Sequence, residues 1–420
     1  MKNRRSIIQT AVIILGIMFY FYYGIYKMIF VHFDLVGRDF IVYYHAAGQF
    51  LHGKSIYTPI EGLSPYFYPP IGLIPIIPFC LLSLDYAIVA WFIFCHVLIL
   101  ISALIIYSFG NKLDYMDSLT AAVLVIGFSM PLQGNIISAN LNILIVFGLS
   151  IIYASLISGR KLLGSSTLAI CTYLKIYPCF LSIAFLKNRD FKFFKTFILC
   201  IIFIGFFSFL IFGLKNHFDF FSLLPSQSSY SQNIESISLP FVLNLFIPKT
   251  YWNIILLIDI LFCLALLISW WSLTKHTDLN HNNDMNIMID LFVLTTVVLL
   301  VFPSTWVFFY HALMIVPFYF IIFGWLQDNK RFKYITLFFI LFFLINFWQQ
   351  IRYHIPVSLD GNTISEIYYN KGSHYFLYPL VSLIHFVIAL TLYFWILTNY
   401  KGLLSFLCYV KKYSPNPNRL

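Results

Sequence analysis

The stretch VGRDFIVYYHAAGQFLHGKSIY, residues 36–57, follows the first long apolar run of the chain and holds one carboxylate, Asp39. Its apolar residues recur at helical spacing, and Gly53 stands where a helix of this length would end. The recurring apolar residues are Phe40, Tyr43, Tyr44, Ala47, Phe50 and Leu51. We therefore expect a short amphipathic helix lying on a membrane surface, with Asp39 as its first or preceding residue.

The chain around this stretch has the composition of an integral membrane protein. Of its 420 residues, 60% are hydrophobic and only 10% are charged, and the mean hydropathy is +0.85. Soluble domains carry about a quarter charged residues. No hydrophilic interval could hold a separate core, so we predict a single all-α polytopic membrane domain over residues 1–420.

Apolar segments recur from end to end. Segments of spanning or near-spanning length fall at roughly 7–30, 86–109, 141–158, 193–214, 251–273, 287–302, 313–326, 334–351 and 376–398. Shorter ones fall near 69–84, 119–132, 162–174 and 176–186. A membrane span needs about 20 residues, so the shorter segments are interpreted as half-helices, tilted segments or re-entrant pieces, and about 11 transmembrane helices are expected.

The positions of the basic residues indicate orientation. The formal net charge is +10, and most of the 26 lysines and arginines flank apolar segments on one set of loops. The positive-inside rule places these loops and the N-terminus in the cytoplasm, so the charge reports topology and no nucleic-acid partner is expected. The loops at 31–68, 215–250, 303–312 and 352–375 then lie outside. We expect a multi-pass protein of the cell (plasma or inner) membrane whose chemistry is extracytoplasmic.

The cysteines and the N-terminus add no further site. All seven cysteines lie in or beside apolar runs, and no spacing predicts a disulfide framework or a metal site. The first apolar run has no small-x-small cleavage site, so we interpret it as an uncleaved helix. No Asp-x-Asp or Glu-x-Asp pair occurs in the outer loops, and neither a bound metal nor a cofactor is expected.

Two interpretations of Asp39 remain open and are compatible. Aspartate is a favoured N-cap, which would start the helix at Phe40. A carboxylate held at a membrane surface is also what a general base acting on a lipid-linked substrate requires. Asp34 lies in the same loop and is a rival for the functional role.

Lys175 lies inside the apolar stretch 162–186, which we expect to enter the membrane and return with Lys175 at its outer tip. An ionisable residue in a membrane segment is costly, and its default interpretation is functional. A lysine at a half-helix tip could hold a phosphate as a compact cation. The alternative is a structural ion pair with Asp259.

Other polar residues of the outer loops are weaker candidates. His311 follows Pro303, Ser304 and Trp306 in a short outer loop or at helix ends, where a lone histidine is more often an interfacial residue than a ligand. A cluster of amides between two half-length helices must face protein or a wet cavity, because lipid offers no hydrogen-bond partners. These amides include Gln133, Asn135, Asn140 and Asn142.

The order of these motifs resembles glycosyltransferase family 87. The stretches that carry the resemblance are RDFIVYYHAAGQFLHGKSIY, YFYPPIGLIPIIPF, LNILIVFGLS and LKIYPCFLSIAFLKNRDFK. The resemblance covers about residues 1–330, and its first two motifs are the most specific. The family consists of polytopic GT-C-fold enzymes, among them phosphatidylinositol-mannoside mannosyltransferases and some arabinofuranosyltransferases.

The resemblance implies transfer of a sugar, a hexose such as mannose or a pentose, from a polyprenyl-phosphate donor. The acceptor would be a hydroxyl of a lipid or envelope glycan on the extracytoplasmic face, usually with inversion. The family's base in the first outer loop corresponds to Asp39. The lysine of its LKxYP motif corresponds to Lys175, near the donor phosphate. The donor- and acceptor-binding residues expected are Arg38, Tyr43, Tyr68, Asn140, Asn142, Lys175 and His311.

Two motifs depart from the family pattern. Where members often have Gly-Gln-x-Asn, this chain has Ala139, Asn140, Leu141 and Asn142. The late Ser-Trp motif usually has its histidine two or three residues after the tryptophan, whereas His311 follows Trp306 by five.

The chemistry of the residues agrees with the implied reaction. A sugar on a lipid phosphate already carries a good leaving group, so one base and a few cations suffice. A transporter or flippase of lipid-linked sugars is the alternative from another class, because half-helices and a buried lysine are also transporter features. An inactive scaffold for envelope assembly is the third hypothesis.

Overall fold

The structure is a computed structural model, and it describes most of the chain as helix. It describes residues 2–26, 37–58, 63, 65–227, 238–244, 247, 251–274, 283–302, 307–327, 332 and 377–413. Within these residues every regular element is helical and none is a strand. The predicted all-α class is therefore confirmed.

The N-terminal half contains short helices between long ones. Its elements are α1 (Lys2–Phe21), the π-helical turn η1 (Tyr22–Tyr26), α3 (Arg38–Leu51), the 3-10 helices η3 (Pro70–Leu73) and η4 (Ile77–Leu81), α4 (Leu84–Ser108), α5 (Tyr115–Gly127), α6 (Met130–Ile137) and α7 (Asn142–Ser158). The sequence of η3 begins with proline, whose fixed backbone angle suits the first position of a helix.

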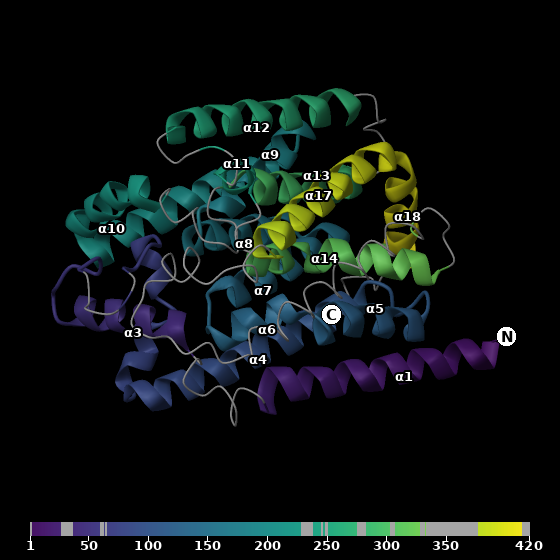
Figure 1. Cartoon of the computed structure of the whole chain (residues 1–420), viewed down its shortest axis with the longest axis horizontal. Helices are drawn as coiled ribbons and strands as arrows, with labels where there is room; N and C mark the ends of the chain where they lie inside the picture. Colours follow the sequence, from purple (N-terminus) through teal and green to yellow (C-terminus); the bar gives the residue numbers. More distant parts are fainter. Residues whose placement is uncertain are drawn as a thin grey trace.

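The second half packs around a buried central helix. Its elements are α8 (Lys161–Leu174), η5 (Tyr177–Ser182), α9 (Ile183–Lys187), α10 (Phe191–Gln227), α11 (Leu239–Asn244), α12 (Trp252–Thr274), α13 (Asn283–Val301), α14 (Val307–Leu326), α17 (Leu377–Thr398) and α18 (Tyr400–Tyr413). Every residue of α13 from Met285 to Leu300 is buried. In Figure 1, α13 lies between α1 and α12, which run along opposite edges of the bundle.

Five helices of the described residues are long and apolar enough to cross a membrane. They lie in α1 with η1, α4, α10, α12 and α13, and a sixth span results if α17 and α18, bent by 77°, count as one. The predicted number of about 11 spans is therefore not confirmed. The predicted segment 334–351 lies outside the described residues.

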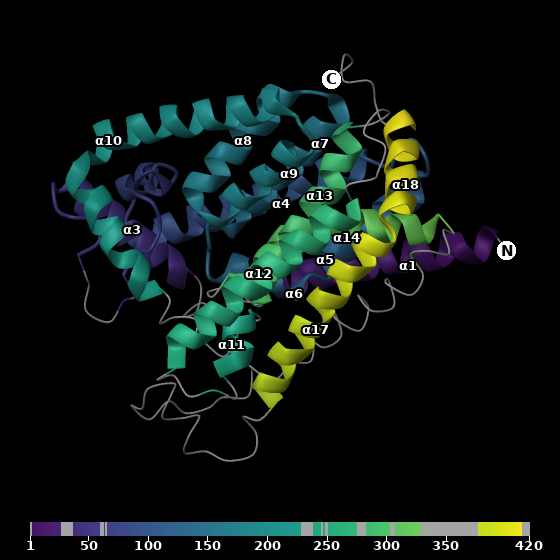
Figure 2. The ribbon, with the colours of Figure 1, turned by 90° about the horizontal axis from the view of Figure 1, so that it is seen from above.

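The start of α1 and the helix α3 lie on opposite sides of the molecule (Figure 2), and four ion pairs join helices across the described residues. They join the ends of helices that are distant in the sequence. The pairs are Arg5–Asp117 at 2.8 Å, Lys161–Asp190 at 2.5 Å, Lys187–Asp290 at 2.8 Å and Lys411–Asp284 at 3.0 Å.

The Lys187–Asp290 pair is buried and fully bonded. Both carboxylate oxygens of Asp290 accept hydrogen bonds from Lys187 at 2.8 Å. Trp270 donates to the same carboxylate at 2.7 Å, and Asn188 donates at 2.5 Å. The Lys187 ammonium also lies 4.7 Å from the centre of the Trp270 ring. Such saturation is what allows an ion pair to remain away from water.

Two breaks in long helical segments shape the end of the bundle that carries α3. The predicted stretch 162–186 is helical on both sides of Lys175, which ends α8 in an extended conformation. The helix α10 is broken at Gly213, which has a φ of 71° that favours glycine. The second half of α10 continues to Gln227, so part of the predicted outer loop 215–250 is helical instead. It contacts the first loop, where Asn216 accepts from the backbone N–H of Ile56 at 3.1 Å.

The helix α3 buries one face against the bundle. Phe40, Tyr43, Ala46 and Ala47 are buried, and the Phe40 ring stacks on that of Trp91 from α4 at 5.4 Å. Leu51, which the spacing assigns to the apolar face, is 53% exposed. The helix was expected to end at Gly53, and this is confirmed.

That helix end has the double hydrogen bond of a Schellman motif. Gly53 has a φ of 70° and donates its N–H to the carbonyl of Phe50 at 2.9 Å. Lys54 donates its N–H to the carbonyl of Gln49 at the same distance.

Candidate active site

The start of α3 is held by the end of α6. The backbone N–H of Gly37 donates to the carbonyl of Ile137 at 2.8 Å, and that of Asp39 donates to the carbonyl of Ser138 at 2.9 Å. The first N–H groups of a helix and the last carbonyls of another have no partners within their own helices. Here the two sets satisfy each other, and the positive end of α3 meets the negative end of α6.

The interpretation of Asp39 as an N-cap is therefore wrong. The helix begins at Arg38, and the residue before it, Gly37, has a φ of 81° and makes no side-chain cap. Asp39 lies in the first turn of α3. Because carbonyls of α6 do the capping, the carboxylate is not used for it and is left to other contacts.

Asn140 connects this carboxylate to Lys175. Its amide group Nδ2 donates to Asp39 Oδ2 at 2.5 Å, and its carbonyl Oδ1 accepts from Lys175 Nζ at 3.1 Å. The same Oδ1 accepts from the backbone N–H of Asn142 at 2.9 Å. Two donors therefore fix the oxygen side of the Asn140 amide, which forces its NH₂ toward Asp39.

The backbone turn before Asn140 explains where the amide lies. The N–H of Ala139 donates to the carbonyl of Ile136, and that of Asn140 donates to the carbonyl of Asn135, each at 2.9 Å. This is again a Schellman motif, with Ala139 at a φ of 55° in the position that usually favours glycine. The indole N–H of Trp91 donates to the Ala139 carbonyl at 3.0 Å, which ties the turn to α4.

A layer of buried polar groups supports Asn140. Asn142 is completely buried, and its amide donates to Asn135 Oδ1 at 2.7 Å. Its carbonyl oxygen accepts from the hydroxyl of Tyr177 at 3.3 Å. Because of these contacts, the Asn142 amide faces protein. The arrangement does not favour the direct contact with substrate that we expected for Asn142.

Lys175 is 3% exposed and faces the same group of residues. Its ammonium lies 4.9 Å from the centre of the Tyr68 ring, a cation–π contact, in addition to its bond to Asn140. Asp259, the alternative partner, lies on α12, and its buried Oδ1 has no hydrogen-bond partner within the described part of the chain. The acidic group that acts on Lys175 is Asp39.

The electrostatics of Asp39 and Lys175 are linked. Burial raises the pKa of the Asp39 carboxyl, whereas the Asn140 hydrogen bond and the charges of Lys175 and Arg38 lower it. Burial lowers the pKa of the Lys175 ammonium, and the charge of Asp39 raises it. Each charged group therefore favours the ionised form of the other.

Aromatic rings form the wall beside this pair. The Tyr43 ring lies 5.6 Å from that of Tyr68 and 6.0 Å from that of Tyr66, with edge-to-face geometry. Tyr57 lies 5.8 Å from Tyr66, and its hydroxyl donates to the carbonyl of Tyr68 at 2.7 Å. Tyr43 is 2% exposed, whereas Tyr68 is only partly buried and presents part of its ring.

The structure gathers most of the residues that the sequence singles out, but not all can be placed. Asp39, Asn140 and Lys175 form one bonded chain, with Tyr43 and Tyr68 beside it, and Arg38 is exposed one residue before Asp39. His311 lies in α14, but its side chain is outside the described residues, as are Asp34 and residues 303–306.

Trp91 and Tyr177 are contributors that the sequence analysis did not select. Each is an aromatic residue in an apolar run, and no local signal separates it from core residues. Their roles depend on one hydrogen bond each, to the Ala139 carbonyl and to Asn142. Such contacts are set by tertiary packing and cannot be predicted from spacing.

Comparison with known families assigns the chain. The model of glycosyltransferase family 87 matches residues 66–303, more than half of the chain. The chain belongs to glycosyltransferase family 87. No curated protein matches it. This family-87 protein is a membrane glycosyltransferase, which acts on a sugar donor and an acceptor.

The match begins after α3, so it does not include Asp39. The geometry connects the two regions, because Asn140 and Lys175 of the matched range contact Asp39 directly or through one amide. No group of three or more His, Cys, Asp or Glu side chains in the described residues is placed to hold a metal ion.

Proposed function

We propose that this family-87 protein transfers a hexose such as mannose, or a pentose, from a polyprenyl-phosphate donor to a hydroxyl of a lipid or envelope glycan. The single observation that carries this proposal is the bonded chain Asp39–Asn140–Lys175 at the start of α3. It combines one carboxylate, a fixed amide and a buried cation.

In the proposed reaction, Asp39 takes the proton from the acceptor hydroxyl. The acceptor oxygen then attacks the anomeric carbon of the donor sugar, and the bond from that carbon to the phosphate oxygen breaks. The electron pair leaves with the polyprenyl phosphate, which is a good leaving group without protonation. One displacement inverts the anomeric configuration, and a single carboxylate is sufficient for it.

Asn140 acts as a positioning residue in this mechanism. It holds Oδ2 of Asp39, so Oδ1 is the oxygen that we assign to the acceptor. An amide whose orientation is fixed by Lys175 and Asn142 cannot rotate to offer its oxygen to Asp39. The base therefore has one orientation before substrate arrives, which lowers the cost of reaching the reactive geometry.

The two cations, Lys175 and Arg38, have different roles in the proposed mechanism. Lys175 is buried, so we assign it to keeping Asp39 ionised and not to direct contact with the donor phosphate, the role that the family resemblance implied. Arg38 is exposed beside the base, and its planar guanidinium suits a phosphate. Tyr68, partly exposed over Lys175, is placed to contact the sugar or the prenyl chain.

The proposal includes the orientation of the protein in the membrane and the extent of its membrane domain. By the positive-inside rule, we place the N-terminus and the basic loops in the cytoplasm, and α3 with Asp39 on the extracytoplasmic face of the cell membrane. The whole chain forms one GT-C-type membrane domain in this proposal. His311, the fifth residue of α14, stays a proposed donor- or acceptor-binding residue.

The test is an Asp39→Asn variant, assayed with polyprenyl-phospho-sugar and a membrane acceptor. Asp85→Asn is the matched control, because Asp85 is an exposed carboxylate in the first turn of α4. We expect loss of transfer by about 10²–10⁴-fold in Asp39→Asn alone, the usual contribution of a positioned base. Full activity of Asp39→Asn at normal expression would refute the assignment of the base.

A further inference from the structure

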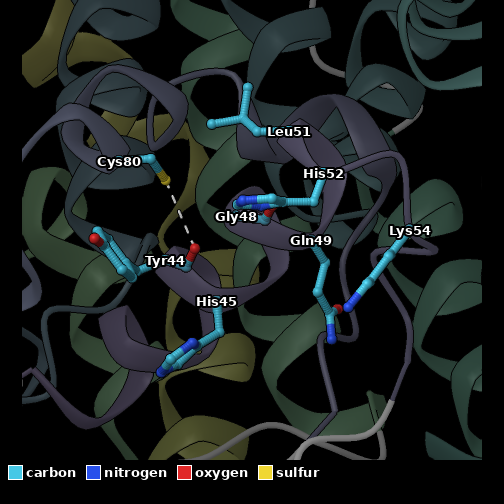
Figure 3. Close-up of a pocket in the computed structure, with 8 residues that line it drawn as sticks. All are labelled: Tyr44, His45, Gly48, Gln49, Leu51, His52, Lys54 and Cys80. Atoms are coloured by element: carbon cyan, nitrogen blue, oxygen red, sulfur yellow. Dashed lines mark hydrogen bonds between the residues drawn. The ribbon is translucent and has the colours of Figure 1, made fainter.

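The face of α3 that points away from Asp39 contains a second candidate site. A hollow of about 360 Å³ lies along it, a volume typical of ligand sites. Figure 3 shows its lining, which is made by Tyr44, His45, Gly48, Gln49, Leu51, His52, Lys54 and Cys80. Asp39 and Tyr43, which face the candidate active site, are not among these residues.

The chemistry of this hollow favours an anion. Lys54 supplies a cation, His45 and His52 supply imidazole rings, Gln49 supplies an amide, and none of the eight lining residues is acidic. His52 Nδ1 lies 2.7 Å from the Gly48 carbonyl, which can only accept, so Nδ1 carries the hydrogen. The other ring nitrogen, Nε2, is therefore left for a ligand group that donates a hydrogen bond, such as a headgroup hydroxyl.

Gly48 forms the open floor of the hollow. A side-chain carbon added at Gly48 would meet nothing within 4 Å. Glycine in the middle of a helix costs about 1 kcal/mol relative to alanine. Gly48 has an ordinary helical φ, so backbone conformation does not require glycine there. The residue keeps free the space that a ligand would occupy.

The rim of the hollow is apolar. Leu51 in its wall is 53% exposed, and Leu81, the residue after Cys80, is 88% exposed. Leu82 is 42% exposed, and its carbonyl accepts from the Tyr44 hydroxyl at 2.8 Å. A cation beside exposed aliphatic side chains is suited to a lipid with an anionic headgroup.

We propose that this hollow binds the phosphodiester headgroup of an anionic membrane phospholipid, with Lys54 on the phosphate and Leu51 and Leu81 beside the acyl chains. Bound lipid would fix α3, and with it Asp39, at the membrane surface. The site is separate from the candidate active site on the other face of the helix, and it does not depend on the proposed reaction.

The experiment measures binding of phosphatidylglycerol to the full-length protein in detergent by native mass spectrometry. Lys54→Ala should weaken binding about fivefold, the usual effect of one cation near a phosphate surface. Gly48→Leu fills the floor and should weaken binding at least as much, while the added helix propensity protects the fold. Lys195→Ala, an exposed lysine at the other end of the bundle, is the control and should bind as the wild type does.

Three comparisons decide the outcome. Phosphatidylglycerol should bind more tightly than phosphatidylcholine or inorganic phosphate, and equal binding of either would overturn the assignment of an anionic lipid. Unchanged phosphatidylglycerol binding by both Lys54→Ala and Gly48→Leu would overturn the site itself. Asp39→Asn should bind the lipid normally even if transfer is lost, which separates this inference from the proposed reaction.

Discussion

Replacing Asn140 with leucine tests how the base is held. Leucine has a similar size but neither donates to Asp39 nor accepts from Lys175. A hydrogen bond to a charged group contributes about 1.5–3 kcal/mol. Because 1.36 kcal/mol corresponds to a factor of ten, the ionised base should become about 10- to 100-fold less favourable.

The effect should depend on pH in a defined direction. Asp39 must be ionised to accept a proton, so activity rises as the pH rises through its pKa. Burial raises that pKa, and Asn140 is among the groups that lower it. Without the amide the pKa is higher, and the acidic limb of kcat/KM should move to higher pH. The loss of activity should be greatest at acidic pH and smaller at alkaline pH.

The assay is the pH profile of kcat/KM with polyprenyl-phospho-sugar in detergent or proteoliposomes. Asn140→Gln is the matched variant, because it keeps both the donor and the acceptor on a side chain that is one methylene longer. It should restore most of the activity and the wild-type limb. An Asn140→Leu profile that falls equally at every pH, or that does not change, would refute the link between this amide and ionisation of Asp39.

Three further predictions concern Lys175, Trp91 and the Lys187–Asp290 pair. Lys175→Met removes a charge that favours ionised Asp39. It should move the acidic limb of the same pH profile to higher pH and lower activity about tenfold or more at acidic pH. Lys175→Arg keeps the charge and should shift the acidic limb less. Trp91→Phe leaves the Ala139 carbonyl without its donor and should destabilise the protein by about 1–3 kcal/mol, measured by thermal unfolding in detergent; an unchanged melting temperature would contradict it. Asp290→Ala leaves the Lys187 ammonium buried and unpaired and should cost about 3–5 kcal/mol, and the double variant with Lys187→Met should recover much of it; equal melting of single and double variants would contradict the pairing.

Much of α3 could be predicted from the sequence, because its pattern is local. Helical spacing of apolar residues and the position of Gly53 indicated the helix and its end. The start could not be predicted, because the groups that cap it are carbonyls of Ile137 and Ser138, about a hundred residues later in the chain. A pattern that favours Asp as an N-cap says nothing of a competing cap from another helix.

The site residues were predicted one by one, and the contacts between them were not. Asp39 and Lys175 attract notice because ionisable residues are rare in this chain. Asn140 was predicted as a donor- or acceptor-binding residue at a departure from the family's Gly-Gln-x-Asn pattern, but not as the link between Asp39 and Lys175. The structure shows that Ala139 adopts the left-handed conformation that a glycine would adopt, so the turn is formed despite the substitution. Backbone geometry of this kind is set by α4 and α6 together, and no spacing rule contains it.

The start of α3 and the end of α6 are joined by hydrogen bonds between main-chain atoms. Gly37 is needed for its φ of 81°, but at the other positions any amino acid except proline supplies the same N–H, so other side chains on either helix can change while this joint stays in place. Side chains that face the acceptor can therefore differ among relatives while the Asp39 carboxylate keeps its position. Such a joint would let one scaffold change the alcohol it glycosylates while the proton-accepting oxygen stays where it is.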